Sequence, residues 1–186
     1  MKSKIVTLLA MLAFAASSYA APVQNATNGH WYDFIDGGFT WQDALNDAAT
    51  KSHLGMTGYL ATVTSADENS FLVSVSPQLG WLGGSDSGAQ NVNDWTWRTG
   101  PEAGQAFTFT SWNPGEPNNC CGGEDYLQMN WGLGNWNDHG GPGNWWQTNG
   151  YFVEFSNANN VPEPGSLALF GIAIAGFGAL RRRNRA

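Results

Sequence analysis

Apolar residues recur at helical spacing in two segments of the chain. The first predicts an amphipathic helix from about 41 to 51, with Thr40 as its N-cap. The second begins with the capping box formed by Ser65 and Glu68 and ends before Pro77. The apolar positions of the two helices are Trp41, Ala44, Leu45 and Ala48 in the first, and Phe71, Leu72 and Val75 in the second.

Short aromatic and β-branched runs predict the strands. One run opens the central part of the chain at 29–35, and another, 59–63, separates the two helices. After Pro77 the candidates are shorter and are separated by stretches rich in Gly, Asn and Pro; they are 81–84, 95–97, 126–130 and 151–155. Two helices followed by many short, antiparallel strands predict an α+β domain. The stretch 100–119 predicts a long ordered loop, since it carries aromatic side chains.

The first 20 residues have the pattern of a signal peptide. Lys2 and Lys4 precede an apolar run from Ile5 to Ala16, and small residues flank Tyr19 before Ala21. The run is short for a membrane span, so export with cleavage after Ala20 is the better interpretation.

The C-terminal end is equally patterned. Val161-Pro162-Glu163-Pro164 precedes an apolar run from Gly165 to Leu180, and an arginine cluster follows at 181–185. This order resembles the PEP-CTERM sorting tail of Gram-negative bacteria. In that family an exosortase, a membrane protease, removes the tail on the way to the cell surface or extracellular matrix. The resemblance implies transient contact with the inner membrane; a plain C-terminal anchor, the alternative, also places the domain outside the cytoplasm.

These ends divide the chain into a signal peptide (1–20), one domain (21–156), a polar linker (157–160) and a sorting tail (161–186). The part between the ends, 21–160, holds two basic and 14 acidic residues, a formal charge of −12. A body with only Lys51 and Arg98 as cations excludes nucleic acid as a partner, because phosphate binding requires clustered basic side chains. The charge favours cations instead.

Oxygen-bearing side chains concentrate between Trp112 and Asp138. This stretch contains no basic residue, and its candidate ligands are Glu116, Asn118, Glu124, Asn137 and Asp138. Three carboxylates with two amide oxygens suit Ca²⁺, a hard cation that takes six to eight oxygens. The sequence therefore predicts one calcium ion here. Solvated loop acids are the plain alternative.

The order of motifs resembles the C-type lectin-like domain from about residue 29 to 155. The resemblance rests on Trp81-Leu82-Gly83-Gly84, Trp95-Thr96-Trp97, Trp112-Asn113-Pro114-Gly115-Glu116-Pro117-Asn118, Glu124-Asp125, Trp136-Asn137-Asp138 and Phe152-Val153-Glu154-Phe155. It implies that the five candidate side chains bind both calcium and a sugar. It also implies a cis peptide bond before Pro117, which turns Glu116 and Asn118 to the same side. The Asp138 carbonyl would add a further ligand.

In the family, the Glu-Pro-Asn order goes with mannose-type sugars such as mannose, glucose, N-acetylglucosamine and fucose. Two neighbouring hydroxyls would each give a lone pair to Ca²⁺. Each would donate its hydrogen to Glu116 or Glu124 and accept from the amide of Asn118 or Asn137. The expected partner is therefore a mannose-type glycan or an exopolysaccharide.

The cysteines depart from the family pattern. Tyr126 and Val153 stand where framework cysteines are expected, so stability must come from an aromatic core and from calcium. The two cysteines present, Cys120 and Cys121, are adjacent, with Cα atoms about 3.8 Å apart. A bond between them, pairing with another chain, and free thiols all remain open.

The resemblance suggests a weaker auxiliary calcium site from Asp86, Asn119 and Asp125, with Glu124 shared. The three histidines are too scattered for zinc, and His139 is expected at most at the rim of the loop site. Trp112 and Trp136 are expected in the core. Trp145 and Trp146 are less clear, and one of them could lie exposed beside the site.

Two other function classes compete with sugar binding. One is a structural-calcium module that binds a protein in an adhesion or matrix role. The other is an enzyme, in which Glu124 and Asp138 would form a glycosidase pair. No nucleophile arrangement of Ser or Cys with His is evident, and carboxylates that bind a metal are committed as ligands. We therefore expect a binding protein and no enzyme.

Overall fold

The computed structural model describes residues 21–87, 94–141 and 147–157. The predicted signal peptide, the sorting tail, most of the linker, and Trp145 and Trp146 lie outside these ranges. Within them, no helix combines the length and the apolar character needed to cross a membrane.

Both helices begin where the capping residues predict. Helix α1 (Trp41–Ala48) starts after Thr40, whose side chain accepts a hydrogen bond from the Asp43 N–H. Helix α2 (Ala66–Val75) starts after Ser65, which accepts from the Glu68 N–H. Helix α1 ends three residues earlier than the predicted 51. There the Thr50 hydroxyl turns back onto the Asp47 carbonyl.

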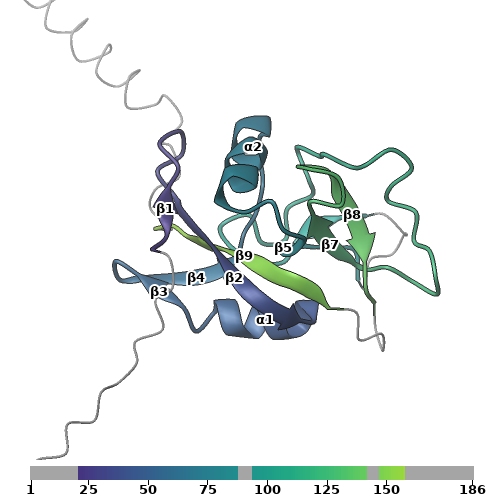
Figure 1. The fold of residues 1–186 in the computed structure, drawn as a ribbon, viewed down its shortest axis with the longest axis horizontal. Coiled ribbons are helices and arrows are strands. Elements are labelled where there is room, and N and C mark those ends of the chain that lie inside the picture. The colour runs from purple at the N-terminus through teal and green to yellow at the C-terminus, as the bar shows by residue number, and fades with distance from the viewer. Residues whose placement is uncertain (1–20, 88–93, 142–146, 158–186) are drawn as a thin grey trace, which may run out of the picture.

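The strands form a mixed sheet in the order β1-β2-β9-β5-β7-β8, with β4 also pairing β9, β3 pairing β4, and β6 pairing β5 (Figure 1). The elements are β1 (Val23–Gln24), β2 (Trp31–Phe39), β3 (Ser52–His53), β4 (Met56–Leu60), β5 (Gly80–Ser85), β6 (Thr96–Trp97), β7 (Tyr126–Met129), β8 (Trp136–His139) and β9 (Thr148–Phe155). The α+β class is confirmed. The β5–β9 pair is parallel, whereas only antiparallel strands were expected.

One predicted strand is displaced. The strand expected at 59–63 is β4 at 56–60, and residues 61–63 leave the ladder while staying buried. Their apolar pattern serves the core rather than a strand. The Ala61 N–H still donates to the Phe152 carbonyl at 2.9 Å, which holds this exit against β9.

Two clusters of buried side chains form the core, and both are rich in aromatics. One cluster gathers Trp97, Trp136 and Phe152 under α2 and the long loop, and the other gathers Trp81 and Tyr151 with α1. The positions of the missing framework cysteines belong to this packing. Tyr126 stacks on Trp41 of α1 with ring centroids 4.7 Å apart, and buried Val153 lies in the cluster that contains Ala44 and Ala48 of α1. The core therefore connects α1 to β7 and β9 without disulfides at these positions.

The long loop between β6 and β7 contains neither helix nor strand, as predicted, yet it is anchored. Phe107, Phe109 and Trp112 each make edge-to-face contacts with the fully buried Trp136. These contacts fix the loop over β8, which carries the Trp136-Asn137-Asp138 motif.

Candidate functional site

Asp138 of β8 anchors the Glu116–Asn118 segment. Its carboxylate is fully buried and accepts from the backbone N–H groups of Asn118 at 3.1 Å and Asn119 at 2.6 Å. These bonds join the loop directly to the sheet, over a separation of about 20 residues in the chain.

Glu116 is the least satisfied member of the set. The peptide bond between Glu116 and Pro117 is cis, as the resemblance implies. Among the described residues, the buried Oε2 atom of Glu116 has no hydrogen-bond partner. The pKa of Glu116 is raised to about 6, first by burial and then by the neighbouring Asp138 and Glu124 carboxylates. A carboxylate among like charges, with an orphaned oxygen, is an arrangement that a bound cation would relieve.

Glu124 and Asn118 are brought together by one backbone group. The Cys120 N–H donates to Asn118 Oδ1 at 2.9 Å and to Glu124 Oε2 at 3.0 Å. Asn119 closes the turn, since its side-chain oxygen accepts from the Glu124 N–H at 2.8 Å. Two of the predicted ligand oxygens therefore converge on a single point of the loop.

Four of the five predicted side chains line one cavity of about 230 Å³. They are Glu116, Asn118, Glu124 and Asn137. Asp138 does not line the cavity; its carboxylate binds the backbone of the loop residues Asn118 and Asn119. Asn137 is buried, and its amide lies 3.5 Å from Gln128 Oε1 on the neighbouring strand β7. The cavity thus combines carboxylate and amide groups from the loop and from β8.

The donor set fits calcium. Every predicted side-chain ligand offers a carboxylate or amide oxygen, the ligand type that Ca²⁺ prefers, and the orphaned Glu116 oxygen is available to it. The carboxylate oxygens of Glu116, Glu124 and Asp138 do not all lie within 4.8 Å of one another, whereas the ligand-type atoms of His30, Glu68 and Glu154 do. Backbone N–H groups from residues 118–120 occupy several oxygens of Glu124 and Asp138 instead.

The residues of the predicted auxiliary site are only partly assembled. The Asp86 N–H donates to the Asp125 carbonyl at 3.2 Å. Burial raises the pKa of the Asp125 carboxyl, and the nearby Asp86 charge adds to this effect. Asn119, however, is engaged with the Glu124 backbone. A second calcium ion here stays a prediction.

Several residues of the cavity were not predicted as site residues. Trp131, Gly123, Cys120 and Cys121 line it, and the two cysteines are bonded to each other. His139 also lines it, with Nδ1 3.4 Å from Glu124 Oε1, so it lies at the rim that the sequence suggested. The signal for Trp131 was a lone aromatic within a Gly- and Asn-rich turn.

A cluster of one histidine with two carboxylates lies away from the loop cavity. His30, Glu68 and Glu154 place ligand-type atoms within 4.8 Å of one another, and no sequence motif had linked these three residues. Protein groups already bond this cluster. His30 Nδ1 lies 2.6 Å from Glu154, the Tyr59 hydroxyl donates to Glu154, and the Tyr32 hydroxyl donates to Glu68. The cluster is therefore a buried polar network.

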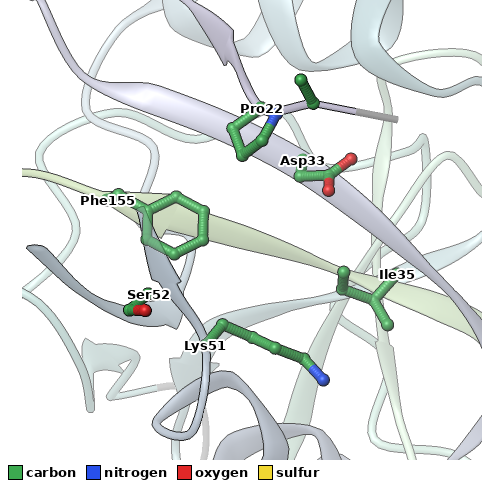
Figure 2. A pocket seen from close by; sticks show the side chains of 7 residues that line it. Pro22, Asp33, Ile35, Lys51, Ser52 and Phe155 are labelled. Carbon is green, nitrogen blue, oxygen red and sulfur yellow. The ribbon is translucent and has the colours of Figure 1, made fainter. Parts of the chain in front are cut away.

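A second cavity lies away from the loop. Its volume is about 280 Å³. Figure 2 shows the side chains that line it, with Pro22 and Asp33 on one edge and Lys51 on the opposite edge. Its lining shares no residue with the loop cavity. The Lys51 ammonium is paired with Asp47 at 3.0 Å, and burial raises the pKa of the Asp33 carboxyl. One carboxylate in an apolar pocket is not a calcium site.

Named proteins from other organisms match most of the described domain in sequence. Perlucin of Haliotis laevigata is 31% identical over 123 residues, which cover 62% of this chain and 71% of perlucin. A C-type lectin of Micrurus corallinus is 30% identical over 129 residues, which cover 66% of this chain and 78% of that lectin. The chain belongs to the C-type lectin-like family.

The C-type lectin-like chain also matches part of a far larger protein. Halomucin of Haloquadratum walsbyi is 34% identical over 140 residues, which cover 70% of this chain but only 1% of halomucin. The carbohydrate-recognition domain of cow CD23, crystallised in the presence of a GlcNAc2Man3 oligosaccharide, superposes with a TM-score of 0.55. It is 23% identical and covers 69% of this chain and 89% of that domain, which shows the shared fold.

The tail of this C-type lectin-like chain matches a separate family. Residues 160–183 match the PEP-CTERM protein-sorting motif. This confirms the resemblance seen at the C-terminal end and indicates an exported protein.

Proposed function

We propose that this C-type lectin-like domain binds carbohydrate in a calcium-dependent manner. The observation that carries the proposal is the loop cavity, where Glu116, Asn118, Glu124 and Asn137 meet and the buried Glu116 Oε2 lacks a partner. The lectins among its relatives and the oligosaccharide present with the cow CD23 domain support the same conclusion.

Each side chain of the site has its own role in the proposed sugar binding. Bound Ca²⁺ would supply coordination positions for two neighbouring hydroxyl oxygens. Glu116 and Glu124 accept the hydrogens of these hydroxyls, because a carboxylate is a pure acceptor. Asn118 and Asn137 donate from their amides to the same oxygens. Asp138 keeps the loop on β8 through its two backbone hydrogen bonds.

The order of acid and amide around Pro117 sets the preferred sugar. With Glu116 before and Asn118 after the proline, we expect mannose-type sugars: mannose, glucose, N-acetylglucosamine or fucose. The double exchange Glu116→Gln with Asn118→Asp swaps the acceptor and donor positions. Its binding should move toward galactose-type sugars in a competition assay, and an unchanged ranking would contradict this assignment.

The proposed organisation extends to the whole chain. It comprises a signal peptide (1–20), the lectin domain (21–156), a linker (157–160) and a sorting tail (161–186). The described strands begin at Val23 and end at Phe155, which supports the domain limits. The sorting motif supports a location on the surface or in the extracellular matrix of a Gram-negative bacterium, which we propose is reached after an exosortase processes the tail at the inner membrane.

A glycan array probed with the exported chain tests the proposal. Binding to mannose-type sugars in calcium should disappear in EDTA and return when calcium is restored. Glu124→Gln should weaken it by at least about tenfold, the scale on which even supporting residues act. Asp67→Asn, an exposed acid at the start of α2, is the charge-matched control and should bind as the wild type does.

Two outcomes would overturn sugar binding. If calcium raises the melting temperature while no glycan binds, the loop is a structural calcium site that serves a protein partner. If a glycoside is turned over and Glu124→Gln abolishes the turnover, the domain is an enzyme. The lectin fold and the lectin relatives support a sugar-binding protein over both alternatives.

A further inference from the structure

The lining of the loop cavity also includes apolar groups that calcium chemistry does not use. Beside the four oxygen-bearing residues the cavity is lined by Trp131 and by the disulfide of Cys120 with Cys121. Trp131 is 53% exposed, although a tryptophan side chain is usually largely buried. An exposed indole at the edge of a polar cavity indicates an amphipathic ligand.

The exposure of Trp131 is built into the turn between β7 and β8. The backbone N–H groups of Asn130 and Trp131 both donate to the Asn135 carbonyl, at 2.9 and 3.2 Å. Asn130, with a φ of 70°, accepts from the Gly134 N–H and donates its amide to two carbonyls after α2. This turn is hydrogen-bonded to the body of the domain, so the backbone that carries the indole is fixed beside the cavity.

The backbone that carries the Cys120–Cys121 disulfide is also hydrogen-bonded beside the cavity. The Cys120 N–H bridges Asn118 and Glu124, and the Cys120 carbonyl accepts from the Gly123 N–H at 3.0 Å. A disulfide has no S–H donor, and its sulfur atoms are polarizable and weakly polar. The bonded pair therefore places an apolar surface directly beside two of the proposed sugar ligands.

A hexose matches a cavity with both kinds of lining. When its neighbouring hydroxyls face the oxygen-bearing residues, its C–H groups and any methyl substituent are left to face the apolar ones. We propose that Trp131 and the Cys120–Cys121 disulfide form an apolar wall that contacts a methyl group of the bound sugar. The site then favours hexoses that carry a methyl group, in the 6-deoxy position or in an N-acetyl group. This inference rests on the proposed calcium-dependent sugar binding and specifies its ligand class.

Matched sugar pairs test the wall. Competition by mannose against 6-deoxymannose, and by glucose against N-acetylglucosamine, is measured on the full oxidised chain at saturating calcium. The methyl-bearing member of at least one pair should bind about fourfold more tightly, as expected for one buried methyl group. Which pair shows the preference distinguishes a 6-deoxy from an N-acetyl sugar.

Variants assign the preference to the wall. Trp131→Ala should abolish it and weaken binding of the preferred sugar by about threefold to tenfold. The double variant Cys120→Ser with Cys121→Ser should reduce the preference as well. Leu133→Ala is the matched control, because Leu133 is 71% exposed on the same turn yet lines a different cavity. It should leave both affinity and preference unchanged.

The outcomes separate the two proposals. Calcium-dependent binding with equal affinities within both pairs, or with Trp131→Ala matching Leu133→Ala, overturns the wall alone. Absence of binding to every sugar in calcium overturns the proposed function and the wall together. Melting temperatures of the variants, measured in calcium, show that each domain is folded when its binding is compared.

Discussion

At the scale of single residues, Glu116 shows how the site is prepared for a cation. Its pKa is raised to about 6 by burial, with Asp138 and Glu124 adding to the effect. Because the folded state then holds a proton more readily than the unfolded chain, the calcium-free contribution of Glu116 to stability is present below its ordinary pKa. It is lost as the pH rises through about 6. A bound cation reverses this preference.

Calcium affinity should therefore fall in acid. Protons and calcium compete for the Glu116 carboxylate, so the affinity should decline as the pH drops through about 6 and be about tenfold weaker one unit below. Isothermal titration with calcium at pH 7.5, 6 and 5 measures the decline. Glu116→Gln should bind more weakly with a flatter pH profile. An affinity that is constant down to pH 5 would contradict the prediction.

Residue types in order were enough to predict the five ligand candidates, and four of them do line one cavity. The wall was not predictable in the same way. Trp131 looked like any turn aromatic, and only the folded structure shows that it lines the same cavity as Glu124. The state of Cys120 and Cys121 was open from the sequence; the structure joins the two neighbours.

At the scale of elements, aromatic stacking occupies one of the positions where a framework cysteine was expected, Tyr126. Tyr126 at the start of β7 lies parallel to Trp41 of α1, with an interplanar angle of 8°, and makes an edge contact with Trp81 of β5. One side chain thus joins three elements directly behind the Glu124-Asp125 segment. Its packing supports the loop from within.

Tyr126→Phe and Tyr126→Leu measure this support. Phenylalanine keeps the ring and should change stability little, whereas leucine loses the stack and should cost about 1 kcal/mol beyond the lost area. Chemical denaturation with calcium and with EDTA gives both values. If leucine is tolerated as well as phenylalanine, the stack does not stabilise the domain.

Both helices and most strands were predictable because capping residues and apolar periods mark them locally. Strand β8 was not, since it reads Trp-Asn-Asp-His and buries Asn137 and Asp138 as well as Trp136. Polar residues at buried strand positions break the usual alternation, and here they carry the proposed site. Strands β1 and β3 have two residues each, too few for a sequence pattern, and are defined by their pairing with β2 and β4.

At the scale of the whole molecule, the buried network of His30, Glu68 and Glu154 joins the residue before β2, helix α2 and the last strand, β9. Glu154 is almost fully buried and is bonded by His30, Tyr59 and the Thr62 backbone. The hydrogen bond from the His30 ring to the Glu154 carboxylate raises the pKa of His30 above its ordinary value, against the effect of burial. Burial raises the pKa of Glu68, and the Glu154 charge adds to this.

Stability should therefore depend on pH through His30. A raised folded pKa means that the charged pair contributes fully below about pH 6.5, and the contribution is lost as the pH rises through the folded pKa. The difference in unfolding free energy between wild type and His30→Gln should be about 1 kcal/mol at pH 5.5 and shrink by pH 8.5. Glu68 is common to both proteins and cancels. A difference independent of pH would rule out a charged pair.

The pairing of the first long strand with the last has a consequence for how the domain is displayed. Trp31 at the start of β2 lies opposite Phe155 at the end of β9, so the chain enters and leaves the fold at one pole. Strands β7 and β8 and the long loop occupy the other pole (Figure 1). A domain tethered through its C-terminal end would thus carry the proposed binding loop on the pole that faces away from the tether.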